Sequence, residues 1–405
     1  MKSPRYVLAM IVGFAFVLDS QAQPLSQEKR DAIIARLSDT SFVNRSGALR
    51  SIIKYNIVEA LPAMESKFPT EPSLCVRMVY LRAFEHLAST NLHAFALMLL
   101  DSADVIASRP GFGCEPTEAK ANAAYYLFKL GDNSGVPYLF DALHDSSFHA
   151  VDFLWLEMLR GVAAQLPQYA VQAKTEMIRI SHDDPLRWTR MSALRYLGEL
   201  YSTELFPDLL ISATSDSDAG NRMYAMTLLF KLNYPAMSSL LAERLVGESS
   251  QVLHIEFADS LLRRYGSPPD YRVVLEFLPQ ETDTVAQYFI ERALVDFVPP
   301  RANAASSVSA MLDSLRTELQ QLLAYNWVGN DSFVSELDSH LQLAQSYLSS
   351  GDSGRSNAEV RFFQRSVETE HRDSTLGFNR FVTTNGWKYL CYNAQYILDR
   401  LSKPR

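Results

Sequence analysis

A helix–turn–helix unit at residues 119–143 places the strongest constraint on the fold of this chain. Its sequence, AKANAAYYLFKLGDNSGVPYLFDAL, opens with apolar residues at helical spacing: Ala123, Ala124, Leu127 and Leu130. Gly131 can end this helix because a residue without a Cβ accepts a positive φ. Pro137 can begin the second helix, since the N–H that proline lacks would have no intrahelical partner there. Such a pair cannot bury its apolar faces alone, so it must stack on copies of itself.

The unit recurs along most of the chain in a common register. A small residue follows a basic reference residue of the first helix after three positions, a large apolar residue after seven and a proline after seventeen. The complete copies have reference residues Arg45, Lys120 and Arg190, and less complete copies start from Arg77 and Arg222. Further copies, with poorer first helices, are indicated around 148–180 and 251–279. The mean period of about 34 residues is typical of helical-pair repeats and predicts an all-α fold.

An acidic residue stands six positions before four of the reference bases. The pairs are Asp39 with Arg45, Glu71 with Arg77, Asp184 with Arg190, and Asp216 with Arg222. An acid at a helix N-terminus accepts from unpaired N–H groups and suits the helix dipole. Its carboxylate can also pair with an arginine of the same or the neighbouring helix. A charged track for a ligand is the alternative, but the spacing follows the repeat, so we expect a structural ladder of ion pairs between repeats.

The pattern A-A-x-x-L-x-x-L-G-D-x-x-x-V-P-x-L in residues 119–143, and ALRYLGEL in residues 193–200, resemble the HEAT family, specifically the short HEAT-like repeats also found in phycobilisome lyases. The resemblance covers roughly residues 40–295. It implies a HEAT-like α-solenoid, a right-handed α/α superhelix whose second helices line a concave, usually protein-binding, face.

A change of pattern near residue 298 predicts a second domain. Two prolines followed by small polar residues, VPPRANAASS, cannot continue either helix. Beyond them, longer amphipathic helices are expected over about 308–325, 332–349, 355–371 and 383–401, and their short connections favour a small antiparallel bundle. We therefore expect a solenoid over 23–298, a linker over 299–307 and a helical bundle over 308–402.

The C-terminal segment resembles the helical module called FIMAH, which ends exported bacterial proteins of varied N-terminal content. The resemblance rests on Asn326-Trp327-Val328-Gly329-Asn330, on Gly351-Asp352, and above all on the closing run NAQYILDRL, residues 393–401. The segment 368–384 is longer and more polar than is usual in the module. The module implies export and an appended bundle.

The first 22 residues are expected to be a signal peptide. Lys2 and Arg5 precede an apolar run over residues 6–18, and Ser20-Gln21-Ala22 forms a small-x-small cleavage pattern. The run is shorter than the roughly 20 residues that a membrane span needs, although an uncleaved anchor is an alternative. We expect cleavage after Ala22, no membrane span after removal, and a periplasmic, secreted or cell-surface protein.

Export makes the cysteines informative, because that compartment is oxidising. Cys75 and Cys114 stand at equivalent helix starts of consecutive units, which stacking brings together. A disulfide between them is therefore reasonable, with two buried thiols as the alternative. Cys391 lies among apolar residues of the last expected helix and is interpreted as a small buried residue.

The sequence contains none of the motifs that usually indicate a catalytic, nucleotide-binding or redox site. The chain lacks H-E-x-x-H, G-x-S-x-G, a Walker loop and C-x-x-C. His144 and His149, with Asp145 and Asp152, are the densest possible metal ligands, but a loop histidine beside a helix-capping aspartate is more often structural. The net charge of −8 and the absence of a basic cluster argue against nucleic acid.

These observations predict an exported, non-catalytic scaffold that binds another protein without a cofactor or metal. A lyase-associated or metal-dependent HEAT-type enzyme is one alternative, which would need a deep pocket with convergent polar groups. A cell-envelope assembly factor that binds polysaccharide is the other, and it predicts a row of exposed aromatic residues.

Overall fold

The computed structural model describes residues 25–107, 114–144, 153–373 and 380–401. Within these ranges the protein is all-α apart from one very short strand pair, as the sequence predicts. The chain divides into two compact units, here called the N-terminal unit (up to Ser202) and the C-terminal unit (from Thr203). The expected signal peptide lies outside the described residues. The expected linker over 299–307 lies inside the C-terminal unit.

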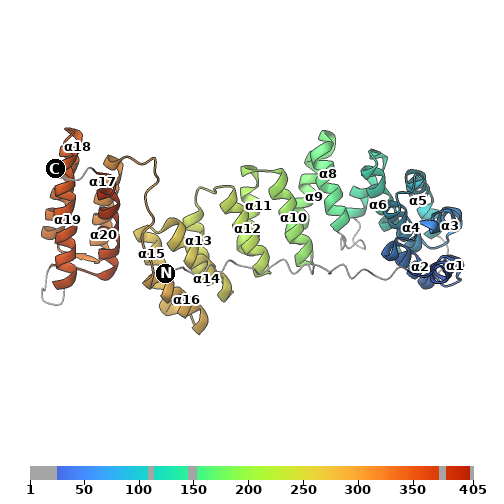
Figure 1. The fold of residues 1–405 in the computed structure, drawn as a ribbon, viewed down its shortest axis with the longest axis horizontal. Helices are drawn as coiled ribbons and strands as arrows, with labels where there is room; N and C mark the ends of the chain where they lie inside the picture. The colour runs from blue at the N-terminus through green and yellow to red at the C-terminus, as the bar shows by residue number, and fades with distance from the viewer. Residues whose placement is uncertain (1–24, 108–113, 145–152, 374–379, 402–405) are drawn as a thin grey trace. The chain divides into compact units, whose positions relative to one another are not determined.

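Helices of the N-terminal unit follow one another in pairs. They are α1 (Gln27–Ala35), α2 (Phe42–Tyr55), α3 (Leu61–Lys67), α4 (Leu74–His86), α5 (Leu92–Ala107), α6 (Pro116–Lys129), α7 (Val136–His144), α8 (Phe153–Gln165), α9 (Ala170–Asp183) and α10 (Arg187–Leu200). Each first helix packs on the next first helix along the series α2, α4, α6, α8 and α10 (Figure 1). Single 3₁₀ turns occupy several connections: Arg36–Ser38, Val58–Ala60, Phe68–Thr70, Asn133–Gly135 and Pro167–Tyr169.

The pair α6 and α7 shows how the sequence produces the unit. Gly131 adopts φ +84°, and the N–H of Asp132 returns to the carbonyl of Leu127 at 2.9 Å, which closes the end of α6. The turn then passes close to α6, because a Cβ on Gly135 would lie 2.6 Å from Cα of Ala124. A residue without a side chain is therefore required at position 135, and it lets the second helix start beside the first.

The C-terminal unit begins with the same kind of helices and ends in a bundle. Its helices are α11 (Phe206–Ser215), α12 (Ala219–Lys231), α13 (Met237–Gly247), α14 (Gln251–Ser260), α15 (Pro268–Phe277), α16 (Thr284–Val295), α17 (Val308–Ala324), α18 (Asp331–Ser349), α19 (Ser353–Asp373) and α20 (Thr384–Leu398). Short 3₁₀ turns cover Thr203–Leu205 and Leu278–Gln280, and a π-helical turn, Leu261–Tyr265, extends α14. In the bundle, α17 to α20 pack in sequence order and α20 returns to α17.

The four bundle helices lie within a few residues of their expected ranges. The sequence did not predict β1 (Val328–Gly329) and β2 (Phe381–Val382), which pair antiparallel across the bundle. A strand of two residues is too short to show the alternation by which strands are recognised.

The bundle is joined to the helical pairs through an aromatic cluster. Tyr389 of α20 lies within 6.3 Å, between ring centroids, of Tyr271, Phe297 and Trp327. Its hydroxyl donates to the carbonyls of Gly266 and Ser267, both at 3.0 Å. The residues expected to form a linker are thus part of a packed junction.

Candidate functional site

A repeated polar turn precedes six of the first helices. At each turn a carboxylate accepts the backbone N–H of the residue two positions later. The six acceptor and donor pairs are Asp39 and Ser41 (2.8 Å), Glu71 and Ser73 (2.9 Å), Asp184 and Leu186 (2.8 Å), Asp216 and Asp218 (2.8 Å), Glu248 and Ser250 (3.1 Å), and Glu281 and Asp283 (2.8 Å). Four of these acids are those that the sequence singles out.

The side chain six positions later donates to the backbone carbonyl of each acid. The bonds are Arg45 to Asp39 (2.9 Å), Arg77 to Glu71 (2.7 Å), Arg190 to Asp184 (2.7 Å), Arg222 to Asp216 (2.7 Å), His254 to Glu248 (3.0 Å), and Gln287 to Glu281. Of the two pairings that the sequence allows for the carboxylate, within one helix or between neighbouring repeats, the bond within the turn is made by the backbone oxygen instead. The carboxylate is already held by the N–H groups of its own turn.

Three reference side chains also contact the acid of the following repeat. Arg45 reaches both oxygens of Glu71 at 2.7 and 2.8 Å, Arg222 reaches both oxygens of Glu248, and His254 reaches Glu281. Burial alone would raise the pKa of Glu248, but Arg222 and the N–H groups of Ser249 and Ser250 outweigh it and lower the pKa to about 2. The ladder is thus a structural device, since these groups are buried.

Sequence reasoning missed Glu248 and Glu281 because their repeats carry His254 and Gln287 at the reference position. A search for an acid 32 or 33 residues after Asp216 and Glu248 would have found both. The repeat spacing was therefore a better signal than the identity of the basic residue.

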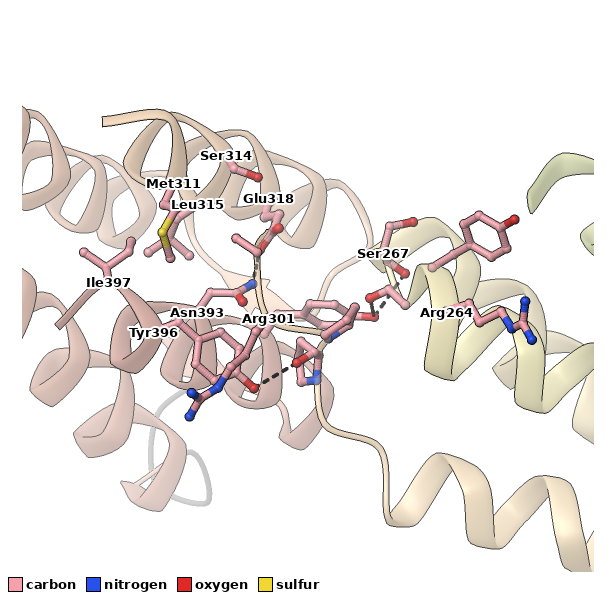
Figure 2. A pocket seen from close by; sticks show the side chains of 16 residues that line it. Arg264, Ser267, Arg301, Met311, Ser314, Leu315, Glu318, Asn393, Tyr396 and Ile397 are labelled. Carbon is pink, nitrogen blue, oxygen red and sulfur yellow. Dashed lines mark hydrogen bonds between the residues drawn. The ribbon is translucent and has the colours of Figure 1, made fainter. Parts of the chain in front are cut away.

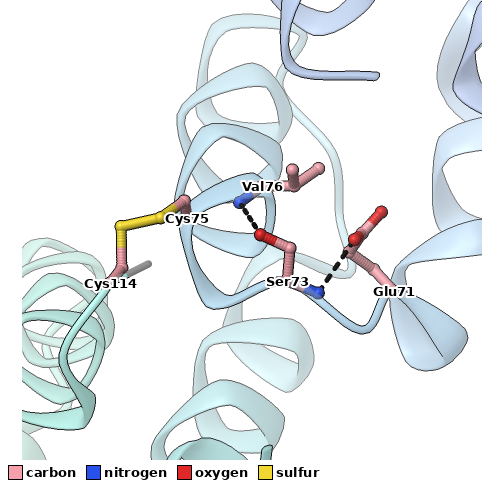
Figure 3. Close-up of a disulfide and its surroundings, with 5 residues drawn as sticks. All are labelled: Glu71, Ser73, Cys75, Val76 and Cys114. Atoms are coloured by element: carbon pink, nitrogen blue, oxygen red, sulfur yellow. Dashed lines mark hydrogen bonds between the residues drawn. A yellow bond between two sulfur atoms is a disulfide. The ribbon is translucent and has the colours of Figure 1, made fainter. Parts of the chain in front are cut away.

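Cys75 and Cys114 form a disulfide in the N-terminal unit (Figure 3). Their Cα atoms are 5.4 Å apart and their sequence separation is 39 residues. The turn made by Glu71 and Ser73 starts α4, and Ser73 caps it by accepting the N–H of Val76. Cys75 is the second residue of α4, and Cys114 lies two positions before the start of α6. Cys391 is a buried free thiol.

Helix α16 is less covered than the first helices that precede it in the C-terminal unit. Only three of its twelve residues are buried (Ala286, Ile290 and Leu294), whereas six of the thirteen residues of α12 are. It packs on α14 and α15, and the chain then passes into the bundle without a second helix to pair with it. The position that follows the reference residue can be compared between repeats. Met223 of α12 and Ile255 of α14 are half-buried at this position, whereas Tyr288 of α16 is 54% exposed.

The uncovered side of α16 carries four apolar residues and one arginine, here called the α16 surface: Val285, Tyr288, Phe289, Arg292 and Val295. Its four apolar members are between 49% and 67% exposed. Arg292 donates to the hydroxyl of Tyr288 at 3.1 Å and approaches Asp296 at 3.5 Å. Aromatic residues and arginine are the side chains that most often dominate binding energy in protein interfaces.

The α16 surface stands on a helix that is held firmly. Lys388 of α20, which is buried, donates to the carbonyls of Leu294 and Val295 at 2.7 and 2.8 Å. These are carbonyls at the end of α16 without an intrahelical partner, so Lys388 caps the helix. Burial lowers the pKa of this ammonium group.

Comparison of the chain with known protein families, with curated proteins and with solved structures finds no match.

The described residues hold no cluster of three or more histidine, cysteine or acidic side chains that could bind a metal. His144 lies 3.5 Å from Glu176, which also accepts from Arg179. His149, Asp145 and Asp152, the other members of the densest ligand set in the sequence, lie outside the described residues. In the described part of the chain, every helix is too short or too polar to cross a bilayer.

Proposed function

We propose that this protein is an exported scaffold that binds another protein through the α16 surface. The observation that carries the proposal is the exposure of Tyr288 and Phe289 on a rigid helix that ends a series of stacked pairs. Terminal repeats of solenoids need a polar outer face for solubility unless something covers them. An apolar helix face of this kind is suited to an amphipathic helix of the partner.

Three further observations support parts of the proposal. The Cys75–Cys114 disulfide favours an oxidising compartment and thus agrees with export. The spacing of 32 or 33 residues between ladder acids and the stacking of first helices support a HEAT-like solenoid. The FIMAH-like module remains part of the proposal on the sequence pattern alone.

Photo-crosslinking tests the surface. A benzoylphenylalanine in place of Phe289 should crosslink, in the envelope fraction of the native host, to one amphipathic helical segment of one protein, identified by mass spectrometry. The matched control carries the same probe in place of Val252, a 66% exposed residue on α14. Crosslinks from both positions to the same mixture of proteins, or crosslinks only to a second copy of this chain, would contradict the proposal.

The double substitution Tyr288→Glu and Phe289→Glu should reduce affinity for the crosslinked partner more than tenfold. Each buried aromatic anchor contributes on the order of 2 kcal/mol, and about 1.4 kcal/mol corresponds to a factor of ten. Calorimetric titration with the partner measures the loss. Val252→Glu is the control and should bind like the original protein, while circular dichroism should show that both variants keep their helices.

A further inference from the structure

A cavity of about 320 Å³ lies in the C-terminal unit, at the junction of the helical pairs with the bundle (Figure 2). Its walls come from the end of the π-helical turn with Gly266 and Ser267, from residues 299–302, and from α17 and α20. Its volume is near the lower end of the range of small-molecule sites, roughly 300–1,000 Å³. It is separate from the α16 surface.

Two tyrosine side chains in the cavity wall are held in place by hydrogen bonds from their hydroxyl groups to the backbone. The hydroxyl of Tyr389 donates to two carbonyls of the turn at Gly266, and that of Tyr396 donates to the carbonyl of Pro299 at 2.9 Å. Met311, Leu315 and Ile397 supply an apolar side. Since these walls are tied to backbone on both sides of the junction, the cavity is preformed.

Glu318 of α17 is the acidic side chain in the cavity lining. It accepts from Nδ2 of Asn393 at 2.6 Å, and its other hydrogen-bonding partner is Ser314. Both partners are neutral, so the described part of the structure supplies no cation that would balance the charge of Glu318. Burial raises the pKa of Glu318 to about 7, although the bonds from Asn393 and Ser314 act in the opposite direction.

The two arginines at the cavity wall are engaged elsewhere. Arg264 stacks on the ring of Phe230, with its guanidinium carbon 4.5 Å from the centroid, and Figure 2 shows it directed away from Glu318. Arg301 lies over Tyr396 at 5.0 Å and approaches Asp399 at 3.6 Å. The other titratable groups of the lining are Tyr265, Tyr389 and Tyr396. The hydroxyls of Tyr389 and Tyr396 already donate to backbone carbonyls.

We propose that this cavity binds a small ligand that carries a protonated amine, with the ammonium group beside the carboxylate of Glu318. Glu318 is half-buried in the cavity wall, and a carboxylate withdrawn from water is costly unless a cation and hydrogen-bond donors accompany it. An ammonium group supplies both in a compact form. The tyrosine rings add a surface toward which cations are attracted, and the apolar side accommodates a short alkyl chain.

The test compares n-butylammonium with 1-butanol, its uncharged analogue of similar shape, by NMR titration of the full chain with ¹³C-labelled glutamate carboxyl groups. The ammonium compound should bind at least tenfold more tightly than the alcohol and shift one carboxyl resonance. That resonance should disappear in Glu318→Gln, and the binding should disappear with it. Equal binding of the two compounds, or unchanged binding by the variant, would overturn the proposal.

Dependence on pH provides a readout that needs no variant. If the ligand binds only the ionised form of Glu318, affinity should be about tenfold weaker at pH 6 than at pH 8, since a group with a pKa of about 7 is mostly protonated at pH 6. Butylammonium is charged at both values, so the change reports the protein. A flat profile would contradict the assignment of Glu318. Because the α16 surface is not involved, failure here leaves the proposed protein interaction untouched.

Discussion

Replacing Arg222 with methionine should destabilise the C-terminal unit by about 3 kcal/mol, because the buried Glu248 loses its bidentate partner and keeps Arg244, whose Nη2 lies 3.3 Å from its carboxylate. Hydrogen exchange of the full chain, followed by mass spectrometry, measures the effect in peptides of α12 to α14. A measurement resolved along the chain is needed because stacked repeats need not unfold in a single step.

Two variants distinguish this loss from a general effect of removing an arginine. Arg263→Met breaks an exposed pair with Asp259, in which Arg263 is 76% exposed, and should cost less than about 1 kcal/mol. The double variant Arg222→Met with Glu248→Met should recover a large part of the stability, since no buried charge remains. A loss in Arg222→Met no greater than in Arg263→Met would mean that the ladder does not stabilise the unit.

The same pair predicts a dependence on pH. The pKa of Glu248 is about 2 in the folded protein, below its value in an unfolded chain, so the pair contributes its full stability above about pH 4.5. This contribution should fade as the pH falls toward 2, where Glu248 becomes protonated in both states. In Arg222→Met, this part of the acid dependence should be missing.

Reduction of the Cys75–Cys114 disulfide should destabilise the N-terminal unit by about 4 kcal/mol. The bond closes a loop of 39 residues, and the chain-entropy relation gives this value for a loop of that length. Thermal or urea unfolding with and without dithiothreitol measures it, with hydrogen exchange in α4 to α6 to locate the change.

The variant Cys75→Ala with Cys114→Ala provides the control. It should resemble the reduced protein and show no response to dithiothreitol. Cys391→Ala, which removes the free thiol, should keep the full response. An oxidised protein whose stability is the same with and without reductant would show that the disulfide makes no contribution.

Much of the fold could be predicted from local sequence, because helices are short-range structures. Apolar spacing and the glycine and proline at the turn placed the pair within residues 119–143, and Gly131 has the positive φ expected of a helix end. The same reasoning located the four bundle helices. All of these signals involve residues within a few positions of one another, where the chain itself fixes the geometry.

The partners of the acids that recur with the repeat depended on tertiary structure. The sequence shows that Asp39 stands six positions before Arg45. It does not show that Arg45 donates to the backbone oxygen of Asp39 and not to its carboxylate. That outcome depends on the direction in which the Asp39 side chain turns, and the N–H of Ser41 decides it. The backbone carbonyl and the carboxylate of one residue have the same position in the sequence, so spacing cannot tell which of them accepts the bond.

Neither the α16 surface nor the cavity at Glu318 could be predicted from the sequence. Val285, Tyr288 and Phe289 have an ordinary amphipathic spacing, and they are exposed only because no second helix follows α16 to cover them. In the sequence Glu318 looks like any acid on a bundle helix, and only the fold places it in the same cavity lining as the distant residues 266 and 299.

The sequence by itself determined the helices, the turns and their period, since these follow from neighbouring residues. Tertiary structure alone decided which side chains are covered, because burial depends on residues far apart in the chain.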